Sequence, residues 1–555
     1  MGALSDHIIG RLMDAGVRAI FGMPGGGGNL DLIEAAGRAG LPFVLTATET
    51  GGALAAIAQA EVTGRPGACL TTLGPGAASV ANGVACALLD RAPIVVFTDS
   101  HASASAGAFE HQQLDQQALF HPITKWTGRL SPECAARTID EALAALLDLP
   151  PGPVHVECPE DSGLGERDSG LEIRERLRPE RGGGAKPGVA GPPSESSWGW
   201  GPTSTEKSKP AAVETLISRV RRPLLIVGLG ARRPEDAAAI RAFLERRGVP
   251  AMVTYKAKGV VPDDHACFGG VFTNARIEES IVAASDLIIG VGLDPVELLP
   301  RPWKYDQPVV YVGRWRVADR HVPFAAQRVV DIPAGVSEMD ACLQACEWDL
   351  DFVRAQVAEG RRAIDVRAEG MTAQQVVRIA AERLAHRTRV TVDAGAHMFP
   401  ATMLWPVREP NQLLISNGLS TMGFALPGAI GAALADRDRP VVALTGDGGL
   451  LMCAAELLTA VREKLRIITI VFSDASLSLI EIKQQRRRYR PAGVGLGAVN
   501  WPALAESFGA AAFVAENESG LARAIEEAMM SDGPALIEAK IDRSNYARTL
   551  EAVRG

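Results

Sequence analysis

The sequence predicts an α/β protein made of three doubly wound domains, each a parallel sheet with helices on both faces. Two observations support this fold class. The chain has 555 residues, more than a single hydrophobic core usually organises. Short apolar runs rich in β-branched residues alternate with helix-like segments in three successive regions, a pattern typical of parallel sheets.

Residues 1–165 form the first predicted domain. They open with an amphipathic helix, MGALSDHIIGRLMDAG, which lacks the features of a signal peptide. Strands are predicted at AIFGMPGG, FVLTATE, ACLTTLG and PIVVFTD, with helices between them. Glu49 stands where the second of these strands meets an Ala-rich helix. It is either a solvated residue of the first helical turn or a proton acceptor for something buried, and its sequence neighbourhood alone favours the first role.

Two further domains follow a linker. Residues 166–208 are rich in Gly, Pro, Ser and charge, which predicts the linker. The second domain, residues 209–345, opens with the strand RPLLIVGLG, whose glycines lack the third Gly of a dinucleotide fingerprint and favour a simple tight turn. The third domain, residues 365–545, has predicted strands at VTVDAG, LLISNG, PVVALTGDGG, RIITIVFSD and PALIEAKID.

Composition limits the classes of partner. The formal net charge of −8 gives no reason to expect nucleic acid. No apolar run reaches the length of a membrane span, so we expect no membrane insertion and a cytoplasmic protein. The eight cysteines form no CxxC pair and lie in apolar or helical contexts, which indicates reduced core residues and not a zinc site.

The motif TGDGGLLMCAAELLTAV ends one predicted strand and begins a helix. Gly448 and Gly449 allow the backbone to approach a ligand closely, and amides at a helix N-terminus suit a phosphate. Asp447 would repel a phosphate unless a cation lay between them, so the motif predicts a magnesium diphosphate. Asp474 ends the next strand, and we expect the two carboxylates on neighbouring strands. Capping a helix is the alternative role of Asp474.

These motifs resemble the thiamine-diphosphate enzymes of the acetolactate synthase and 2-oxo acid decarboxylase family. GDG followed one strand later by a polar pair resembles the family's diphosphate-binding motif. The segments FGMPGG, TATETGGALAAIAQAEVTGRPGACLTTLGPGAAS and LISNGLSTMGFALPGAIGAALA are similar to its other signatures. The resemblance implies a pyrimidine-binding domain first, a Rossmann-like middle domain, and a diphosphate-binding domain last. It leaves open whether FAD or ADP binds in the middle domain.

The resemblance gives Glu49 a catalytic role. A Glu at this position hydrogen-bonds a ring nitrogen of the cofactor's aminopyrimidine, which lets the cofactor deprotonate its own thiazolium carbon. We therefore expect Glu49 to be buried at the end of a strand. The family usually has His immediately before this Glu, whereas this chain has Thr48.

The resemblance also implies the metal and cofactor contacts. Magnesium would be held by Asp447, Asp474 and the main-chain carbonyl of Ser476. Met422 would be the apolar wedge that bends the cofactor, although plain core packing is the alternative for a methionine. The remaining predicted cofactor-binding residues are Pro75, His397, Ser420, Gly448, Gly449 and Leu477.

Four residues are candidate substrate contacts. Gly26 lies in the first loop, PGGGGN, and Lys125 matches a Lys near the substrate channel of relatives. The segment AFEHQQLDQQALFHPITKW aligns with one that supplies a Gln to the acetolactate synthase site, and His111 and Gln112 are its candidates.

The resemblance implies decarboxylation of a 2-oxo acid and ligation of the remaining fragment to a second carbonyl, as in acetolactate synthase. The first loop offers only glycine backbone before Asn29, which favours ligation over simple decarboxylation, because no acid stands ready to protonate the intermediate. A non-ligating decarboxylase is the first alternative, and a catalytically silent member of the fold is the second. The family implies a homodimer or homotetramer whose active site lies between chains, with a small-molecule 2-oxo acid as substrate.

Overall fold

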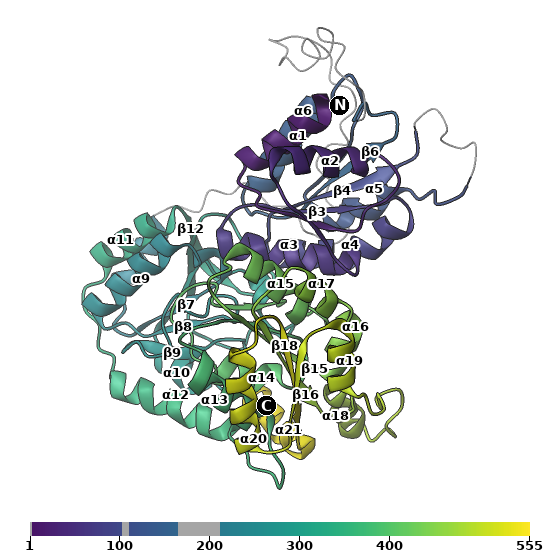
Figure 1. Ribbon diagram of the computed structural model, residues 1–555. Helices are drawn as coiled ribbons and strands as arrows, with labels where there is room; N and C mark the ends of the chain where they lie inside the picture. The colour runs from purple at the N-terminus through teal and green to yellow at the C-terminus, as the bar shows by residue number, and fades with distance from the viewer. Residues whose placement is uncertain (1–2, 103–109, 165–210) are drawn as a thin grey trace. The chain divides into compact units, whose positions relative to one another are not determined.

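A computed structural model of the chain describes residues 3–102, 110–164 and 211–555 (Figure 1). It contains three six-stranded sheets, and every strand pairing recorded within them is parallel, which confirms the predicted fold class. The predicted linker, residues 166–208, lies outside the described residues. The chain separates into two compact units, one of Met1–Gly201 with Ile430–Asp436 and one of Pro202–Ala429 with Arg437–Gly555.

The first unit holds a sheet with the strand order β2-β1-β3-β4-β6-β5. Apolar side chains of α1, α2 and α6 pack on one face of it, while α3 and α4 pack against each other and against β3 (Figure 1). The elements are α1 (Ala3–Asp14), β1 (Ile20–Gly22), α2 (Asn29–Ala39), β2 (Phe43–Leu45), α3 (Glu49–Thr63), β3 (Gly67–Thr71), α4 (Pro75–Leu89), β4 (Ile94–Ser100), α5 (Gln116–Phe120), η2 (His121–Ile123), β5 (Trp126–Arg129), α6 (Ala135–Leu147) and β6 (Val154–Pro159).

The second unit begins with a sheet of order β12-β11-β10-β7-β8-β9. Helices α9 and α11 cover one face of this sheet, and α10 and α12 pack on the other. The elements are α8 (Ala211–Ile217), β7 (Pro223–Val227), η3 (Leu229–Ala231), α9 (Pro234–Arg247), β8 (Ala251–Val253), β9 (Phe268–Val271), α10 (Glu279–Ala284), β10 (Leu287–Val291), η4 (Pro295–Glu297), β11 (Val309–Gly313), β12 (Phe324–Val329), α11 (Ile332–Cys342) and α12 (Leu350–Ile364).

The third sheet, in the same unit, has the order β14-β13-β15-β16-β18-β17. Its elements are α13 (Ala373–Leu384), β13 (Arg389–Val392), α14 (Met398–Leu404), β14 (Leu413–Ile415), α15 (Ala425–Ala435), β15 (Val441–Gly446), α16 (Asp447–Cys453), α17 (Glu456–Arg462), β16 (Ile467–Ser473), α18 (Ser478–Arg486), α19 (Trp501–Phe508), β17 (Ala511–Ala515), α20 (Glu518–Met529), β18 (Ala535–Lys540), η5 (Arg543–Asn545) and α21 (Tyr546–Arg554).

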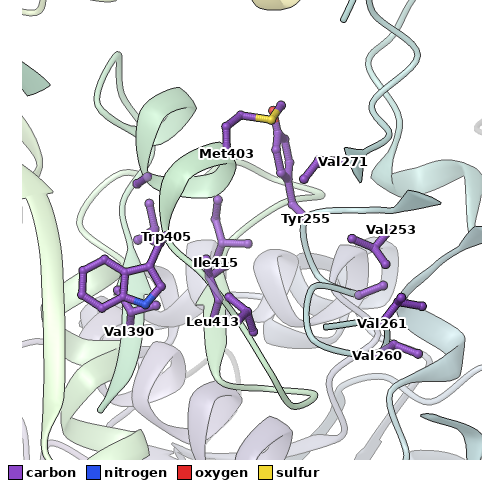
Figure 2. Packing of buried hydrophobic residues seen from close by; sticks show 14 of the residues in the cluster. Val253, Tyr255, Val260, Val261, Val271, Val390, Met403, Trp405, Leu413 and Ile415 are labelled. Carbon is purple, nitrogen blue, oxygen red and sulfur yellow. The ribbon is translucent and has the colours of Figure 1, made fainter. Parts of the chain in front are cut away.

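The second and third sheets share one hydrophobic core. Figure 2 shows Tyr255 beside Met403, with Trp405 and Ile415 in the same cluster of buried side chains. Lys256, which is buried, donates from Nζ to the carbonyl oxygen of Ile415 at 2.9 Å, so the junction is also held by a hydrogen bond. This continuous core fixes the two sheets of the second unit against each other.

The hydrophobic strands β15 and β16 are direct neighbours, as the sequence predicts. Their residues pair in register from Val441 with Ile467 to Gly446 with Phe472. The residues that follow both strands therefore emerge at the same edge of the sheet, where ligands bind in open α/β folds.

No helix in the described part of the chain is long and apolar enough to cross a membrane.

Candidate active site

Asp447 and Asp474 lie together at the carboxyl edge of the third sheet. Asp447 begins α16, and its Oδ2 accepts hydrogen bonds from the backbone amides of Asp474 at 3.1 Å and Ala475 at 2.6 Å. Its Oδ1 accepts from the amide of Gly448 at 2.8 Å. Burial raises the pKa of Asp447, and the three amides oppose this shift.

Asp474 holds the turn before α18 but does not cap this helix, whose N-cap residue is Leu477 and has no side-chain cap. Its Oδ1 accepts from the amide of Ser476 at 3.0 Å, and its Oδ2 accepts from the hydroxyl of Ser478 at 2.6 Å. Burial raises the pKa of Asp474 to about 6, and the negative charge of Asp447 adds to the increase. A carboxyl group whose ionisation is opposed by a neighbouring carboxylate in this way favours a cation beside it.

The two glycines after Asp447 pack closely against neighbouring side chains. A Cβ on Gly448 would lie 2.6 Å from Leu477 Cδ2, and one on Gly449 would lie 2.6 Å from Asp393 Oδ2. Met422 Cε also approaches the Gly448 position, at 3.6 Å. Close packing against the held carboxylate of Asp393 therefore favours glycine at position 449, whereas at position 448 only the end of the Leu477 side chain would have to move.

Asp393 is the residue of this edge that sequence reasoning missed. It follows β13 and is fully buried, and its carboxylate accepts from the amides of Gly423 at 2.9 Å and Ala394 at 2.8 Å and from the hydroxyl of Thr445 at 2.9 Å. Burial raises its pKa to about 6. Asp393 thus connects the segment that carries Met422 to the strand that leads into the GDGG motif.

His397 and Ser420 complete the predicted set in this unit. The His397 ring is buried and stacks on Phe472 with ring centroids 4.9 Å apart, and a Cβ on Gly446 would lie 3.3 Å from its Cε1. Burial lowers its pKa to about 4, and its Nε2 has no hydrogen-bond partner within the described residues. Ser420 is exposed with a φ of 54°, and its hydroxyl donates to the carbonyl of Asn417 at 3.1 Å.

The donor set at this edge fits a magnesium diphosphate. Two adjacent carboxylates supply the hard oxygens that Mg²⁺ prefers, and the backbone of the GDGG turn is suited to an anion. Within residues 3–102, 110–164 and 211–555, no three His, Cys, Asp or Glu side chains gather as a metal site. The remaining oxygens of a magnesium shell would therefore come from the main chain, the diphosphate and water.

In the first unit, Thr48 caps the helix that carries Glu49. The Thr48 side chain accepts from the amide of Gly51 at 2.9 Å, and its φ of −142° is the extended conformation of an N-cap residue. Glu49 is consequently the first residue of α3 and stands four residues beyond the end of β2. It is half-buried within its own chain, and its full burial against a second chain stays a prediction.

The loop before α4 lies next to Glu49. A Cβ on Gly76 would lie 3.3 Å from Glu49 Oε1, which places the carboxylate against the first turn of that helix. Pro75 is exposed at the first position of α4, and Gly74 before it has a φ of 55°. A Cβ on Gly74 would lie 2.7 Å from the carbonyl oxygen of Gln112, so the structure brings the turn containing Gln112 to this loop.

Two of the remaining substrate candidates are exposed. His111 adjoins Gln112, and its carbonyl oxygen lies 2.9 Å from Nε2 of His101. Gly26 is exposed, and a Cβ added to it would meet nothing within 4 Å. The loop around Gly26 is anchored by Asp99, another residue that sequence reasoning missed, whose Oδ1 accepts from the amide of Asn29 at 2.8 Å. Burial raises the pKa of Asp99 to about 7.

Lys125 is not brought to this group. It precedes the first residue of β5, at the amino edge of the sheet, whereas the loops after β2, β3 and β4 leave the carboxyl edge. Its Nζ donates to the carbonyl of Ala145 at 2.8 Å and to that of Asp148 at 2.5 Å, at the C-terminus of α6. Burial lowers its pKa. These contacts make Lys125 a structural cap for α6.

Comparison with known proteins identifies the family. The chain matches the thiamine pyrophosphate enzyme N-terminal TPP binding domain over residues 3–119, the central domain over residues 211–317, and the C-terminal TPP binding domain over residues 393–539. It is 28% identical to an acetolactate synthase of Bacillus subtilis, over 98% of this chain and 93% of the relative. It is 28% identical to the catabolic acetolactate synthase of Raoultella terrigena, over 97% and 95%. It is 26% identical to the acetolactate synthase isozyme 1 large subunit of Escherichia coli, over 97% and 94%. The chain therefore belongs to the thiamine pyrophosphate-dependent enzymes, in the acetolactate synthase-like branch that acts on 2-oxo acids.

Proposed function

We propose that this enzyme decarboxylates a 2-oxo acid and ligates the remaining fragment to a second carbonyl compound, with thiamine diphosphate and Mg²⁺ as cofactors. The observation that carries the proposal is the pair Asp447 and Asp474, which meet at the ends of neighbouring strands beside the GDGG turn. The similarity to acetolactate synthases over nearly the whole chain supports the ligation step.

Each residue of the carboxyl edge has a proposed task. Asp447, Asp474 and the main-chain carbonyl of Ser476 would hold Mg²⁺, and the amides of Gly448 and Gly449 would donate to the diphosphate. His397 would line the diphosphate pocket as a neutral ring, because burial lowers its pKa to about 4 and a backbone hydrogen bond to Leu444 holds the ring in place. When bound, thiamine diphosphate supplies the carbon nucleophile that attacks the 2-oxo acid and accepts the electrons of the broken carbon–carbon bond.

Glu49 is the proposed catalytic carboxyl group. It would share a proton with a ring nitrogen of the cofactor's aminopyrimidine, and water exclusion in the loaded enzyme would strengthen this hydrogen bond. Thr48 holds Glu49 at the start of α3, and Gly76 lets the first turn of α4 approach the carboxyl group, because a Cβ there would lie 3.3 Å from Glu49 Oε1. Met422 and the carbonyl of Ser420 would contact the same cofactor from the segment that Asp393 anchors.

The first loop favours ligation over release of an aldehyde. Residues 25–28 are four glycines, and the position of Gly26 opens to free space, so the loop places no ionisable side chain where it would protonate the bound fragment. The turn of Gln112 lies near Gly74 and supplies an amide that would orient a substrate carboxylate.

The decisive experiment assays the products from pyruvate. The purified enzyme, incubated with pyruvate, thiamine diphosphate and Mg²⁺, is expected to form acetolactate and little acetaldehyde. The Glu49→Gln variant is expected to lose most of this activity while still binding the cofactor. Glu34→Gln, on the exposed surface of α2, is the matched control and should retain full activity. Acetaldehyde as the main product would contradict ligation, and full activity of Glu49→Gln would contradict the proposed chemistry.

We also propose a homodimer or homotetramer in which Glu49 of one chain and Asp447 of another serve the same site. Variants Glu49→Gln and Asp447→Asn are each expected to be inactive as homo-oligomers. Dissociating and mixing them should restore part of the activity, because some mixed pairs contain one site with both native residues. An activity of the mixture no greater than the sum of the activities of the two separate variants would contradict a shared site.

A further inference from the structure

The second sheet has the strand order of a dinucleotide-binding fold. From β9 through β8, β7 and β10 to β12, its strands follow the order 3-2-1-4-5-6 of a doubly wound sheet. The order in which strands are added to the sheet reverses between the parallel neighbours β7 and β10, and in such folds a dinucleotide binds at the carboxyl ends of these two strands. FAD or ADP, if it bound the middle domain in this manner, would need the backbone amides of the turn after β7 for its phosphates.

Those amides are already used within the chain. The amide of Gly230 donates to the carbonyl of Gly292 at 2.9 Å, and the amide of Gly228 donates to the carbonyl of Val291 at 3.0 Å. The amide of Leu229, between them, donates to Oε2 of Glu297 at 2.8 Å. The loop after β10 therefore closes directly over the turn after β7.

Glu297 occupies the position that a phosphate would take. Its side chain is buried, and Oε1 accepts from the hydroxyl of Thr254, the residue after β8, at 2.6 Å. In dinucleotide-binding folds the end of this strand carries the acid that binds the ribose. The Glu297 carboxylate thus accepts hydrogen bonds both from the Leu229 amide, in the turn that would bind a phosphate, and from Thr254, at the position that would bind a ribose. Burial raises the pKa of Glu297 to about 7, as expected for a carboxyl group enclosed by the fold.

No space remains above the turn for a ligand. A Cβ on Gly228 would lie 2.5 Å from Leu293 Cα, and one on Gly230 would lie 2.9 Å from Cη2 of the buried Trp315. The first turn of α9 is also occupied from within, because Asp236 is buried there in an ion pair with Arg314, with Oδ2 2.7 Å from Nη1.

We infer that the middle domain binds no FAD or ADP at this crevice, because the Glu297 carboxylate occupies it. We also infer that Glu297 instead supports the cofactor-binding segment of the third sheet. The support runs through η4. The carbonyl of Glu297 accepts from Nδ2 of Asn417 at 3.1 Å, and the carbonyl of Asn417 accepts from the hydroxyl of Ser420 at 3.1 Å. Glu297 is thus a positioning residue for the segment that ends at Met422.

Nucleotide titration tests the first half of the inference. The enzyme, purified without added nucleotide and saturated with thiamine diphosphate and Mg²⁺, is titrated with FAD and with ADP by calorimetry. Protein denatured after purification is assayed for released flavin and adenine nucleotide. We expect no binding heat and no released nucleotide. Stoichiometric flavin or ADP, or saturable binding of either in the titration, would overturn the inference. These measurements do not depend on which product the enzyme forms.

Two substitutions of one residue test the second half. Glu297→Gln keeps an acceptor for the Leu229 amide, and Glu297→Ala removes it. We expect the Ala variant to bind thiamine diphosphate about tenfold more weakly and to melt at a lower temperature, whereas the Gln variant stays close to wild type. Glu338→Ala, on the surface of α11, is the control for general loss of a middle-domain carboxylate. Wild-type cofactor affinity in Glu297→Ala would overturn the positioning role. If the Ala variant does not fold, Glu297→Asp takes its place, because the shorter side chain draws the carboxylate away from the Leu229 amide. Weaker cofactor binding in Glu297→Asp than in Glu338→Ala supports the role, and equal affinity in the two overturns it.

Discussion

Replacing Gly449 with alanine tests how tightly the GDGG turn is built onto Asp393. The new Cβ would lie 2.6 Å from Asp393 Oδ2 and 2.9 Å from Thr445 Oγ1, whereas ordinary contact begins near 3.4 Å. One of these groups must therefore move by about 0.8 Å. Neither is the free end of a flexible side chain, because Asp393 is held by the amides of Gly423 and Ala394.

The expected cost follows from these contacts. Overpacking a filled site costs about 1–3 kcal/mol, and losing the Thr445–Asp393 hydrogen bond to a charged acceptor costs about 1.5–3 kcal/mol. Alanine gains about 1 kcal/mol over glycine inside a helix, and Gly449 lies within α16. We therefore expect Gly449→Ala to lower the free energy of unfolding by about 2–4 kcal/mol.

The assay compares two glycine variants from neighbouring segments. Gly495→Ala is the matched control, because its Cβ would meet nothing within 4 Å, and it should change stability by less than about 0.5 kcal/mol. Guanidinium unfolding of the cofactor-free proteins gives the stability, and thiamine diphosphate titration gives the affinity. We expect Gly449→Ala to lose about tenfold in affinity, because Asp393 also positions Gly423 beside Met422. Equal behaviour of the two variants would refute the packing argument.

Three further predictions use single contacts. Thr48→Val should destabilise the protein by about 1 kcal/mol through loss of the α3 cap, while Thr48→Ser should not, and thermal melting distinguishes them. Lys125→Met should lower the free energy of unfolding by about 1–2 kcal/mol, measured by melting, and leave KM for the 2-oxo acid unchanged. A raised KM at unchanged stability would instead indicate that Lys125 contacts the substrate. The pKa of Asp99 is about 7 in the folded protein against 3.8 ordinarily, so the stability contributed by its bound proton is complete below about pH 4 and is lost as the pH rises to about 7. Asp99→Asn should therefore remove up to about 4 kcal/mol of this pH dependence. The free energy of unfolding of both proteins is measured near pH 4 and near pH 7, and an equal pH dependence in wild type and variant would contradict the reasoning.

The sequence allowed prediction of features set by local pattern. Apolar runs of strand length fix three parallel sheets, and the interval between GDGG and Asp474 holds one helix and one strand, which makes β15 and β16 neighbours. Asp393 was not recognisable in this way. Its partners Gly423 and Thr445 lie 30 and 52 residues away, so its role depends on contacts that no local pattern records. Glu297 was missed for the same reason, because it meets Leu229 across 68 residues.

Thr48, the residue before Glu49, has a local structural role as the N-cap of α3. Relatives usually carry His at this position, and resemblance gives no reason for Thr48. The structure supplies one: α3 begins at Glu49, and threonine is a strong N-cap residue whose hydroxyl satisfies the amide of Gly51. A carboxylate at the first position of a helix is also stabilised by the helix dipole, so the cap and the acid reinforce each other. Asp447 likewise begins a helix, α16, but there the carboxylate itself accepts from the amide of Gly448. In each unit, therefore, a carboxylate starts a helix at the carboxyl edge of a parallel sheet, and the turn is held by the threonine before the acid in one case and by the acid itself in the other.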